Sequence, residues 1–437
     1  MEFSYLVIIF TALLGLYMAW NIGANDVANS MADAVGSGAL SVRGAVIAAG
    51  ICEFAGAVLV GAHVTNTVRK GIVDPAVLAN IPGVAPEEVA VILIIGMSGA
   101  LLSAAFWLNM STLVGMPVST THSIVGAVAG FGVVAAGWSA VNWAKMGQIV
   151  ASWFISPVAG GVVSFLLFTY ISRAILGKEK PVKAAVVHLP VIVFILTMVV
   201  ILATIYKGLK HVIGDFPWLA GQNAVWVSLA VALFTSTIAW AFARKRLAAR
   251  HNDPLGEQIK AVEKAFVPLV IISSCSVAFA HGANDVANSV GPLAAIIHVL
   301  KTGTIDMKVP VPVWILALGG AGIVLGLATY GFKVMKTVGY KITEITPSRG
   351  VAADIAATAT VLVCTRLSLP VSTTHTLVGA ILGIGLARGL GGVNSRVVTS
   401  IFGSWLFTVP AAALMSVVFY LAGSYFFFDK LLAIMSG

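Results

Sequence analysis

Charged residues are scarce in this chain. Lys, Arg, Asp and Glu make up 10% of its 437 residues, hydrophobic residues make up 59%, and the mean hydropathy is +0.99. A soluble globular chain carries about a quarter charged residues. The composition therefore excludes a soluble globular protein. It predicts an all-α polytopic membrane protein, because runs of about 20 apolar residues cross a bilayer as helices.

Cysteine and acidic residues are also few. The three cysteines, Cys52, Cys275 and Cys364, lie far apart in apolar segments, which excludes a disulfide framework or a cysteine metal site. Basic residues outnumber acidic ones and give a net charge of +9. They lie in loops between apolar segments and not on one face, so we expect no nucleic-acid partner. The first apolar run, Ser4–Ile22, lacks a basic start and a cleavage pattern, so we interpret it as a retained span and not a signal peptide.

Two polar strings each occur twice in this apolar sequence. Gly-Ala-Asn-Asp-Val-Ala-Asn-Ser stands at Gly23–Ser30 and again at Gly282–Ser289. Pro-Val-Ser-Thr-Thr-His stands at Pro117–His122 and again at Pro370–His375. The order is the same in both halves, so the chain is a duplicated unit. We expect a first repeat over residues 1–172, a linking part over 173–264 and a second repeat over 265–437.

Ten apolar segments are typical of ordinary spans. They are Ser4–Ile22, Gly44–Val68, Val89–Leu108, Met146–Ser172, Val186–Tyr206, Ala224–Phe242, Ala265–Ala280, Val313–Phe332, Val351–Leu369 and Val397–Phe428. Two more, Thr112–Val134 and Thr373–Ala387, contain or follow the Pro-Val-Ser-Thr-Thr-His string. Proline, hydroxyls and glycines favour broken helices or re-entrant hairpins there, which a membrane protein tolerates only inside protein or beside water.

Loop charges predict the orientation of the chain. With about twelve crossings and both termini outside, 17 of the 26 Lys and Arg residues fall inside, 8 fall outside, and Arg366 lies within a span. This bias agrees with the positive-inside rule. It predicts a multi-pass protein of the inner or plasma membrane, with the loop 243–264 in the cytoplasm. An odd number of crossings separates the two copies, which predicts inverted repeats, a transporter architecture.

The first string predicts an ion site. Asn25 and Asn29 would share one helix face with Asp26 beside them, and Asn284, Asp285 and Asn288 repeat the set. A helix cap is the alternative interpretation, since Asn and Asp often begin helices. A buried aspartate in each half of a membrane protein is typical of an ion or proton path. We therefore expect Asp26, Asp285, Asn29 and Asn288 to bind a coupling cation.

The second string predicts an anion site. Its three hydroxyls stand where a helix would begin, at a positive dipole end with free N–H groups. Helix capping is again the alternative. We expect phosphate binding by the two hydroxyl sets together with the first asparagine of each copy: Asn25, Asn284, Ser119, Thr120, Thr121, Ser372, Thr373 and Thr374.

Some ionisable residues in or beside the apolar segments remain. We expect His122 and His375 to make an orienting hydrogen bond to the backbone, and His281 receives no role because Ile22 replaces it in the first copy. Glu53 is a further candidate cation ligand. Asp354 and Arg366 form an ion pair or face a cavity, and Asp33 receives no role.

Two aspartates beside an anion site require cations. Like charges repel strongly at low dielectric, and a phosphate-like ligand with two aspartates brings about three to four negative charges. Cation coupling also overcomes the membrane potential, which opposes anion uptake by about 2.3 kcal/mol per charge per 100 mV. The two strings thus predict a cation-coupled anion importer with an oxygen-rich ion site.

The repeated strings resemble those of the inorganic phosphate transporter (PiT) family, from Gly23 to His375. The resemblance implies phosphate uptake driven by sodium or protons, inverted repeats and a homodimer in the lipid bilayer. We expect a sodium-coupled phosphate symporter that works by alternating access around a site near mid-membrane. It implies no cofactor beyond the coupling ions, and it places the Asn-Asp and Ser-Thr-Thr residues above in the ion and phosphate site. The family includes sulfate permeases, so a proton-coupled permease for sulfate or another oxyanion is the nearest alternative.

A rival from another class is an intramembrane hydrolase with Ser119 or Thr120, His122 and Asp26 as nucleophile, base and orienting acid. A channel is a further alternative. The duplication favours a transporter over an enzyme, because catalysis needs only one set of these residues.

Overall fold

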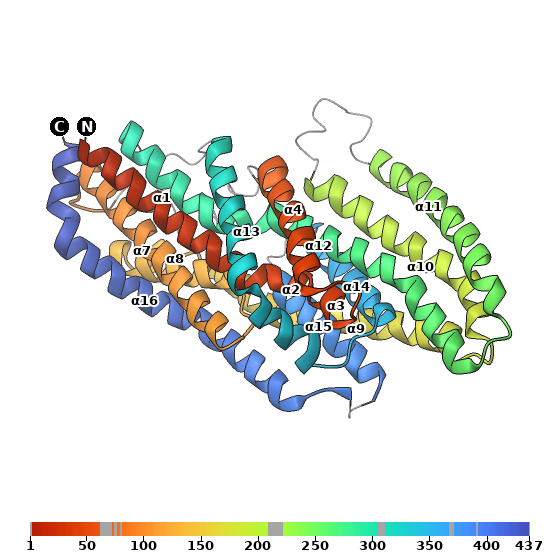
Figure 1. The fold of residues 1–437 in the computed structure, drawn as a ribbon. Coiled ribbons are helices and arrows are strands. Elements are labelled where there is room, and N and C mark those ends of the chain that lie inside the picture. The colour runs from red at the N-terminus through yellow and green to blue at the C-terminus, as the bar shows by residue number, and fades with distance from the viewer. Residues whose placement is uncertain are drawn as a thin grey trace.

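The molecule is an elongated bundle of helices (Figure 1). The computed structural model describes residues 2–61, 72–73, 77–78, 81–208, 222–304, 311–366, 371–389 and 392–436. Within these ranges the regular structure is helical, apart from one isolated bridge between Val73 and Val141. The described part contains nine helices that are long and apolar enough to cross a membrane, which agrees with a multi-pass membrane protein.

The described part of the first repeat contains seven α-helices. They are α1 (Glu2–Ile22), α2 (Ala28–Ser30), α3 (Ala32–Gly36), α4 (Val42–Val60), α7 (Pro86–Leu113), α8 (Thr120–Ala136) and α9 (Trp143–Ile171), with the π-helical turn η1 (Gly23–Val27) joining α1 to α2. The first polar string is therefore helical, and the chain bends after it, near Met31, where the backbone leaves regular helix geometry at φ −108° and ψ 0°.

Five helices belong to the second repeat, the first of which begins in the linking part. They are α12 (Leu255–Thr302), α13 (Val313–Lys336), α14 (Pro347–Arg366), α15 (Thr373–Ala387) and α16 (Ser395–Met435). Helix α12 is continuous over 48 residues, so the expected end of a span at Ala280 is wrong. The prolines within it, Pro268 and Pro292, do not end the helix. The second copy of the polar string lies in the middle of this helix.

The broken segments that the sequence predicts lie between α7 and α8 and before α15. Residues 114–119 leave helical geometry, with Gly115 at φ +71°, and α8 begins only at Thr120. Helices α8 and α15 are the two short apolar helices of the described part. The predicted spans Gly44–Val68 and Val351–Leu369 extend past α4 and α14 into residues outside the described ranges. The number of crossings therefore stays a prediction.

Helices of one repeat pack against helices of the other. Helix α4 packs on α12 and α1 on α13, while α15 packs on α9 and α8 on α16. Glycines allow this close approach. A side chain at Gly282 in α12 would overlap the backbone of Glu53 in α4, and one at Gly23 would overlap the backbone of Ile323 in α13. The two copies of the first string are thus held at the contacts between the repeats.

The linking pair, α10 (Pro181–Ala203) and α11 (Asn223–Leu247), lies at one end of the molecule and packs on the second repeat (Figure 1). Both chain termini lie at the opposite end. Much of α11 is exposed, because only 11% of its most apolar stretch is buried inside the protein. This exposure is expected of a helix that lipid surrounds. The linking part is therefore peripheral to the polar strings at the centre.

Candidate functional site

Serine side chains begin the two short helices. The Ser119 hydroxyl accepts a hydrogen bond from the His122 backbone N–H at 3.3 Å, and Ser372 accepts one from the His375 N–H at the same distance. This is the helix-capping arrangement that the sequence leaves as an alternative. Capping uses only one lone pair of each hydroxyl, so an anion-binding role for the two serines stays a prediction.

The two polar strings meet across the repeats in matching pairs. The Asn29 side-chain amide donates to the Thr374 hydroxyl at 3.2 Å, and that of Asn288 donates to the Thr121 hydroxyl at 3.4 Å. Thr374 and Thr121 hold the same place in their strings, as do Asn29 and Asn288. Each repeat therefore supplies the amide for the hydroxyl of the other.

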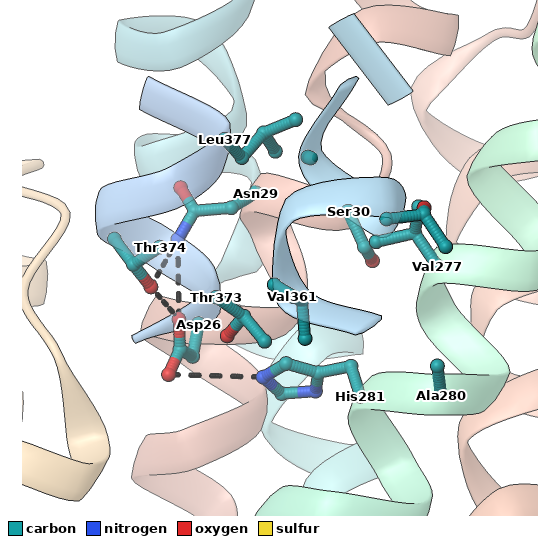
Figure 2. A pocket seen from close by; sticks show the side chains of 12 residues that line it. Asp26, Asn29, Ser30, Val277, Ala280, His281, Val361, Thr373, Thr374 and Leu377 are labelled. Atoms are coloured by element: carbon teal, nitrogen blue, oxygen red, sulfur yellow. Dashed lines mark hydrogen bonds and ion pairs between the residues drawn. The ribbon is translucent and has the colours of Figure 1, made fainter. Parts of the chain in front are cut away.

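Each of these asparagines also contacts the aspartate of its own string. The Asn29 amide lies 3.3 Å from Asp26 Oδ1, and the Asn288 amide lies 3.4 Å from Asp285 Oδ1. The Thr374 hydroxyl also donates to Asp26 Oδ1 (Figure 2). Both aspartates are at most 3% exposed, so an amide or hydroxyl donor replaces part of the water they lose.

His281 lies among three carboxylates. Its Nε2 atom is 2.6 Å from Asp285 Oδ2 and 3.7 Å from Asp26 Oδ2, while Nδ1 is 3.0 Å from Glu53 Oε1. All four side chains are buried, and Figure 2 shows the imidazole directed at Asp26. Asp26, His281 and Asp285 could together hold a metal ion, since their ligand atoms lie within 4.8 Å of one another. Burial of several carboxylates together requires a cation or protons nearby.

His281 received no role from the sequence alone, because the first copy has Ile22 in its place. Its position in the chain still carried a signal, since an ionisable residue directly before a buried polar string is unusual in a membrane segment. Glu53 contacts His281 from α4 and so lies in the same cluster. A ligand of the predicted cation site has to lie there.

Asn25 and Asn284 differ although they are copies. The Asn25 amide donates to the Thr112 hydroxyl and to the Met116 carbonyl, both at 2.9 Å, and its oxygen accepts from the Val118 N–H at 3.0 Å. Asn25 thus ties η1 to the segment that leads into α8. The Asn284 amide donates to Asp285 Oδ1 at 2.7 Å and is partly exposed. Phosphate binding by Asn25 would need at least one of its three bonds to break.

The threonines of the strings and the two histidines complete the site. The buried Thr120 hydroxyl forms no hydrogen bond within the described residues, and Thr373 lines the central pocket. The rings of His122 and His375 lie 4.8 Å apart, and His375 stacks on Trp405 at 3.6 Å. Among the described residues, the ring nitrogens of His375 form none of the orienting hydrogen bonds that we expected. Ring stacking, and not a backbone hydrogen bond, positions this histidine.

A small cavity of about 40 Å³ adjoins the site. Its polar lining includes Asp26, Asn29, Ser30, His281 and Thr374, as Figure 2 shows. Residues of both repeats form it, on η1, α2, α12, α14 and α15. The cavity therefore offers carboxylate, amide and hydroxyl groups to a ligand from both halves of the chain, a donor set that suits a hard cation beside an oxyanion.

Comparison with known proteins identifies the family of this arrangement. The sequence pattern described as the phosphate transporter family matches residues 22–416, which include both copies of both strings. The chain belongs to the phosphate transporter family. The resemblance of the repeated strings to this family is thereby confirmed.

Relatives and a solved structure cover almost the whole length of this phosphate transporter family member. A sequence described as a candidate phosphate permease of Pyrococcus abyssi is 45% identical over 414 residues, which is 94% of this chain and 97% of the relative. The chloroplastic inorganic phosphate transporter 2-1 of Arabidopsis thaliana is 41% identical and covers 94% of this chain and 71% of its own length. A solved structure described as the sodium-dependent phosphate transporter matches with a TM-score of 0.82 at 42% identity, covering 96% and 99% of the two chains.

Proposed function

We propose that this protein imports inorganic phosphate together with sodium ions, by alternating access around the central site. The observation that carries the proposal is the crosswise meeting of the two repeats, in which Asn29 contacts Thr374 and Asn288 contacts Thr121. A site made of both halves changes shape when one half moves against the other. This is the geometric requirement for exposing a ligand to each side of a membrane in turn.

The roles follow from the donor chemistry. Asp26 and Asp285, helped by Asn29 and Asn288, hold the coupling cations, because carboxylate and amide oxygens suit hard ions. Glu53 adds a third carboxylate through its contact with His281. The hydroxyls at the starts of α8 and α15, together with free N–H groups there, hold the phosphate oxygens, and Asn284 is the freer of the two predicted asparagine ligands.

Sodium ions suit the charge balance of this site. Two aspartates and a phosphate bring about three to four negative charges, so more than one small cation is needed. The similar solved structure is that of a sodium-dependent transporter, which supports sodium as the coupling ion. The relatives described as a phosphate permease and as an inorganic phosphate transporter support phosphate over sulfate and a transporter over a hydrolase. A homodimer, which the family resemblance implies, remains part of the proposal.

A proton-driven version of the same function is the second candidate. It is favoured by one observation, the imidazole of His281 between Asp285, Asp26 and Glu53. A protonated histidine would supply one of the positive charges that the carboxylates need. The two candidates differ in the gradient that drives uptake.

The test is phosphate uptake into vesicles that carry the purified full-length protein. A sodium gradient and a pH gradient are imposed separately, with the membrane potential held at zero. We expect the sodium gradient alone to concentrate phosphate and sulfate to compete poorly. Uptake driven by the pH gradient alone would replace sodium coupling with proton coupling, and strong competition by sulfate would overturn the choice of phosphate.

Replacement of the aspartate tests the site itself. Asp26→Asn should lower sodium-driven uptake at least tenfold, because the variant keeps the shape of the side chain and loses the charge that holds the cation. Glu257→Gln is the matched control, since Glu257 is an exposed acid on α12 that pairs with Lys260 at 2.8 Å. Normal uptake by Asp26→Asn would remove Asp26 from the cation site.

A further inference from the structure

A basic cavity lies apart from the central site, where α9 is joined to α10. The joining segment consists of the π-helical turn η4 (Ser172–Leu176) and residues 177–180. The cavity has a volume of about 450 Å³ and is lined by this segment and the first turns of α10. Its size is that of a pocket for a small organic group, roughly 300–1,000 Å³. The transport scheme above uses none of its residues.

The lining of this cavity carries more positive than negative charge. Lys178, Lys180 and Lys183 line it together with one acid, Glu179. Among the described residues, none of the three lysines takes part in an ion pair. Their ammonium groups are therefore available to a ligand, and three positive charges against one favour an anion.

Further basic residues surround the cavity. The short helix η8 (Ala248–Arg250) packs on α10 and brings the end of α11 to this side of the molecule. The region 243–264 holds six Lys or Arg residues and three Asp or Glu residues. Loop charges predict that this side faces the cytoplasm, where the anionic lipids of the inner leaflet attract such basic segments.

Aromatic and basic side chains on α11 indicate the level of the membrane surface. The Arg244 guanidinium carbon lies 5.3 Å from the centre of the exposed Trp240 ring, and such pairs at a helix end anchor it among the headgroups. The Ser236 hydroxyl donates to the Pro190 carbonyl at 2.8 Å. One turn further toward the basic end of each helix, Trp240 therefore stands level with Val187, which lines the cavity. The cavity thus lies at headgroup level.

An apolar surface begins next to the cavity, on its membrane side. The Tyr170 hydroxyl and His188 Nδ1 lie 2.8 Å apart and join α9 to α10. One helical turn deeper, Leu166 on α9 is 60% exposed and Val191 on α10 is 42% exposed. A free anion would need only the lysines, whereas a phospholipid needs cations for its headgroup and an apolar surface for its chains. Both are present here, in the order that a lipid in the bilayer requires.

We propose that this cavity binds the headgroup of an anionic phospholipid. The phosphate lies among the ammonium groups of Lys178, Lys180 and Lys183, and the acyl chains lie along Leu166 and the exposed side of α10. Lysine suits this position, because its apolar stem stays with the chains while its charge reaches the headgroup. A glycerol headgroup also satisfies Glu179, since its hydroxyls donate to the carboxylate. The site is independent of the ion that drives transport.

The test is lipid binding to the purified full-length protein, measured by native mass spectrometry with dioleoyl phosphatidylglycerol and dioleoyl phosphatidylcholine as probes. Each lysine beside an anionic headgroup strengthens binding about fivefold. The cavity variant, which combines Lys178→Gln, Lys180→Gln and Lys183→Gln, should therefore lower the affinity for the first phosphatidylglycerol at least tenfold. Its binding of phosphatidylcholine should stay unchanged.

A second combined variant is the matched control. Lys333→Gln, Lys336→Gln and Lys341→Gln remove the same charge on the same predicted side of the membrane, from α13 and η9 (Thr337–Lys341), outside the cavity. The control variant should bind phosphatidylglycerol like the unaltered protein. Hydrogen exchange locates the lipid, because phosphatidylglycerol, but not phosphatidylcholine, should slow amide exchange in residues 177–184 of the unaltered protein and not in the cavity variant.

Folding is checked by the melting temperatures without added lipid. Both combined variants should melt close to the unaltered protein, because substitutions of surface side chains change stability little. If the cavity variant fails to fold, Lys180→Gln alone replaces it and should weaken phosphatidylglycerol binding about fivefold.

The lipid site is refuted if both combined variants lose phosphatidylglycerol equally, which would mean general attraction by a basic surface. Unchanged amide exchange in residues 177–184 on adding the lipid would also refute it. Displacement of phosphatidylglycerol by millimolar inorganic phosphate would make the cavity a site for free phosphate instead. Absence of sodium-driven phosphate uptake would remove the proposed function and leave this site standing.

Discussion

Identical residues in the two strings have different surroundings, and Asn25 and Asn284 show it best. Asn25 makes three hydrogen bonds to the segment before α8, whereas Asn284 makes one, to its neighbour Asp285. The repetition of the letters predicts equal roles for both residues. The structure gives the first an anchoring role, which the string alone could not reveal because its partners lie 87 to 93 residues away.

The anchoring role of Asn25 predicts unequal effects of the same substitution. Asn25→Ala should lower the free energy of unfolding by about 2–3 kcal/mol, because it removes three hydrogen bonds and leaves the Met116 carbonyl and the buried Val118 N–H without the side chain that pairs with them. Asn284→Ala should lower it by less than about 1 kcal/mol, since its one bond is partly exposed. Thermal unfolding of the purified variants in detergent measures both. Equal losses would contradict the anchor.

His281 shows what a comparison of the copies hides. When candidate residues are chosen because they occur in both copies, a residue present in only one copy is left out. His281 is such a residue, yet it contacts Asp285, Asp26 and Glu53. Inverted repeats share a backbone plan, but one ligand bound at their junction can be contacted differently from each side. Unmatched ionisable residues next to repeated strings therefore belong among the candidates.

At the scale of elements, close crossings of helices fix where the strings lie. Helix α4 meets α12 at Gly282, and helix α1 with η1 meets α13 at Gly23. Both glycines begin the repeated string. These glycines let another helix approach, and α12 continues through its glycine without a break.

The crossing predicts a strong effect of one methyl group. Gly282→Ala should lower the free energy of unfolding by about 1–3 kcal/mol, because its Cβ would overlap the Glu53 backbone and force α4 away. Gly256→Ala on the same helix is the control, since open space surrounds it, and it should be neutral or stabilise by up to about 1 kcal/mol. Similar melting temperatures for the two variants would show that the crossing can relax.

At the scale of the whole molecule, the sequence predicted the helical membrane class, the break before α8 and the meeting of the two strings. These follow from composition, from proline and glycine, and from exact repetition. The segment Thr373–Ala387, which was also expected to be broken, is the continuous helix α15. The sequence did not predict the continuity of α12 or the anchor at Asn25. Those features depend on packing between distant helices, which no local pattern records.

The predicted orientation in the membrane can be tested at the two ends of α12. In a variant whose three native cysteines are replaced by serine, Asn252→Cys should react with an impermeant thiol reagent only from the cytoplasmic side, because basic residues surround that loop. Thr302→Cys should react only from the outside, since one long helix separates the two positions. Reaction of both from the same side would contradict the inverted arrangement.

The two copies of the first string differ in stiffness. One lies within an unbroken rod of 48 residues, while the other lies in a chain of short pieces joined by a π-helical turn and a bend at Met31. A rod transmits force along its length, and a jointed segment yields at its joints. Opening and closing around the shared ligand should therefore be asymmetric. Residues 23–36 should bend most, while the second copy of the string in α12 should stay fixed.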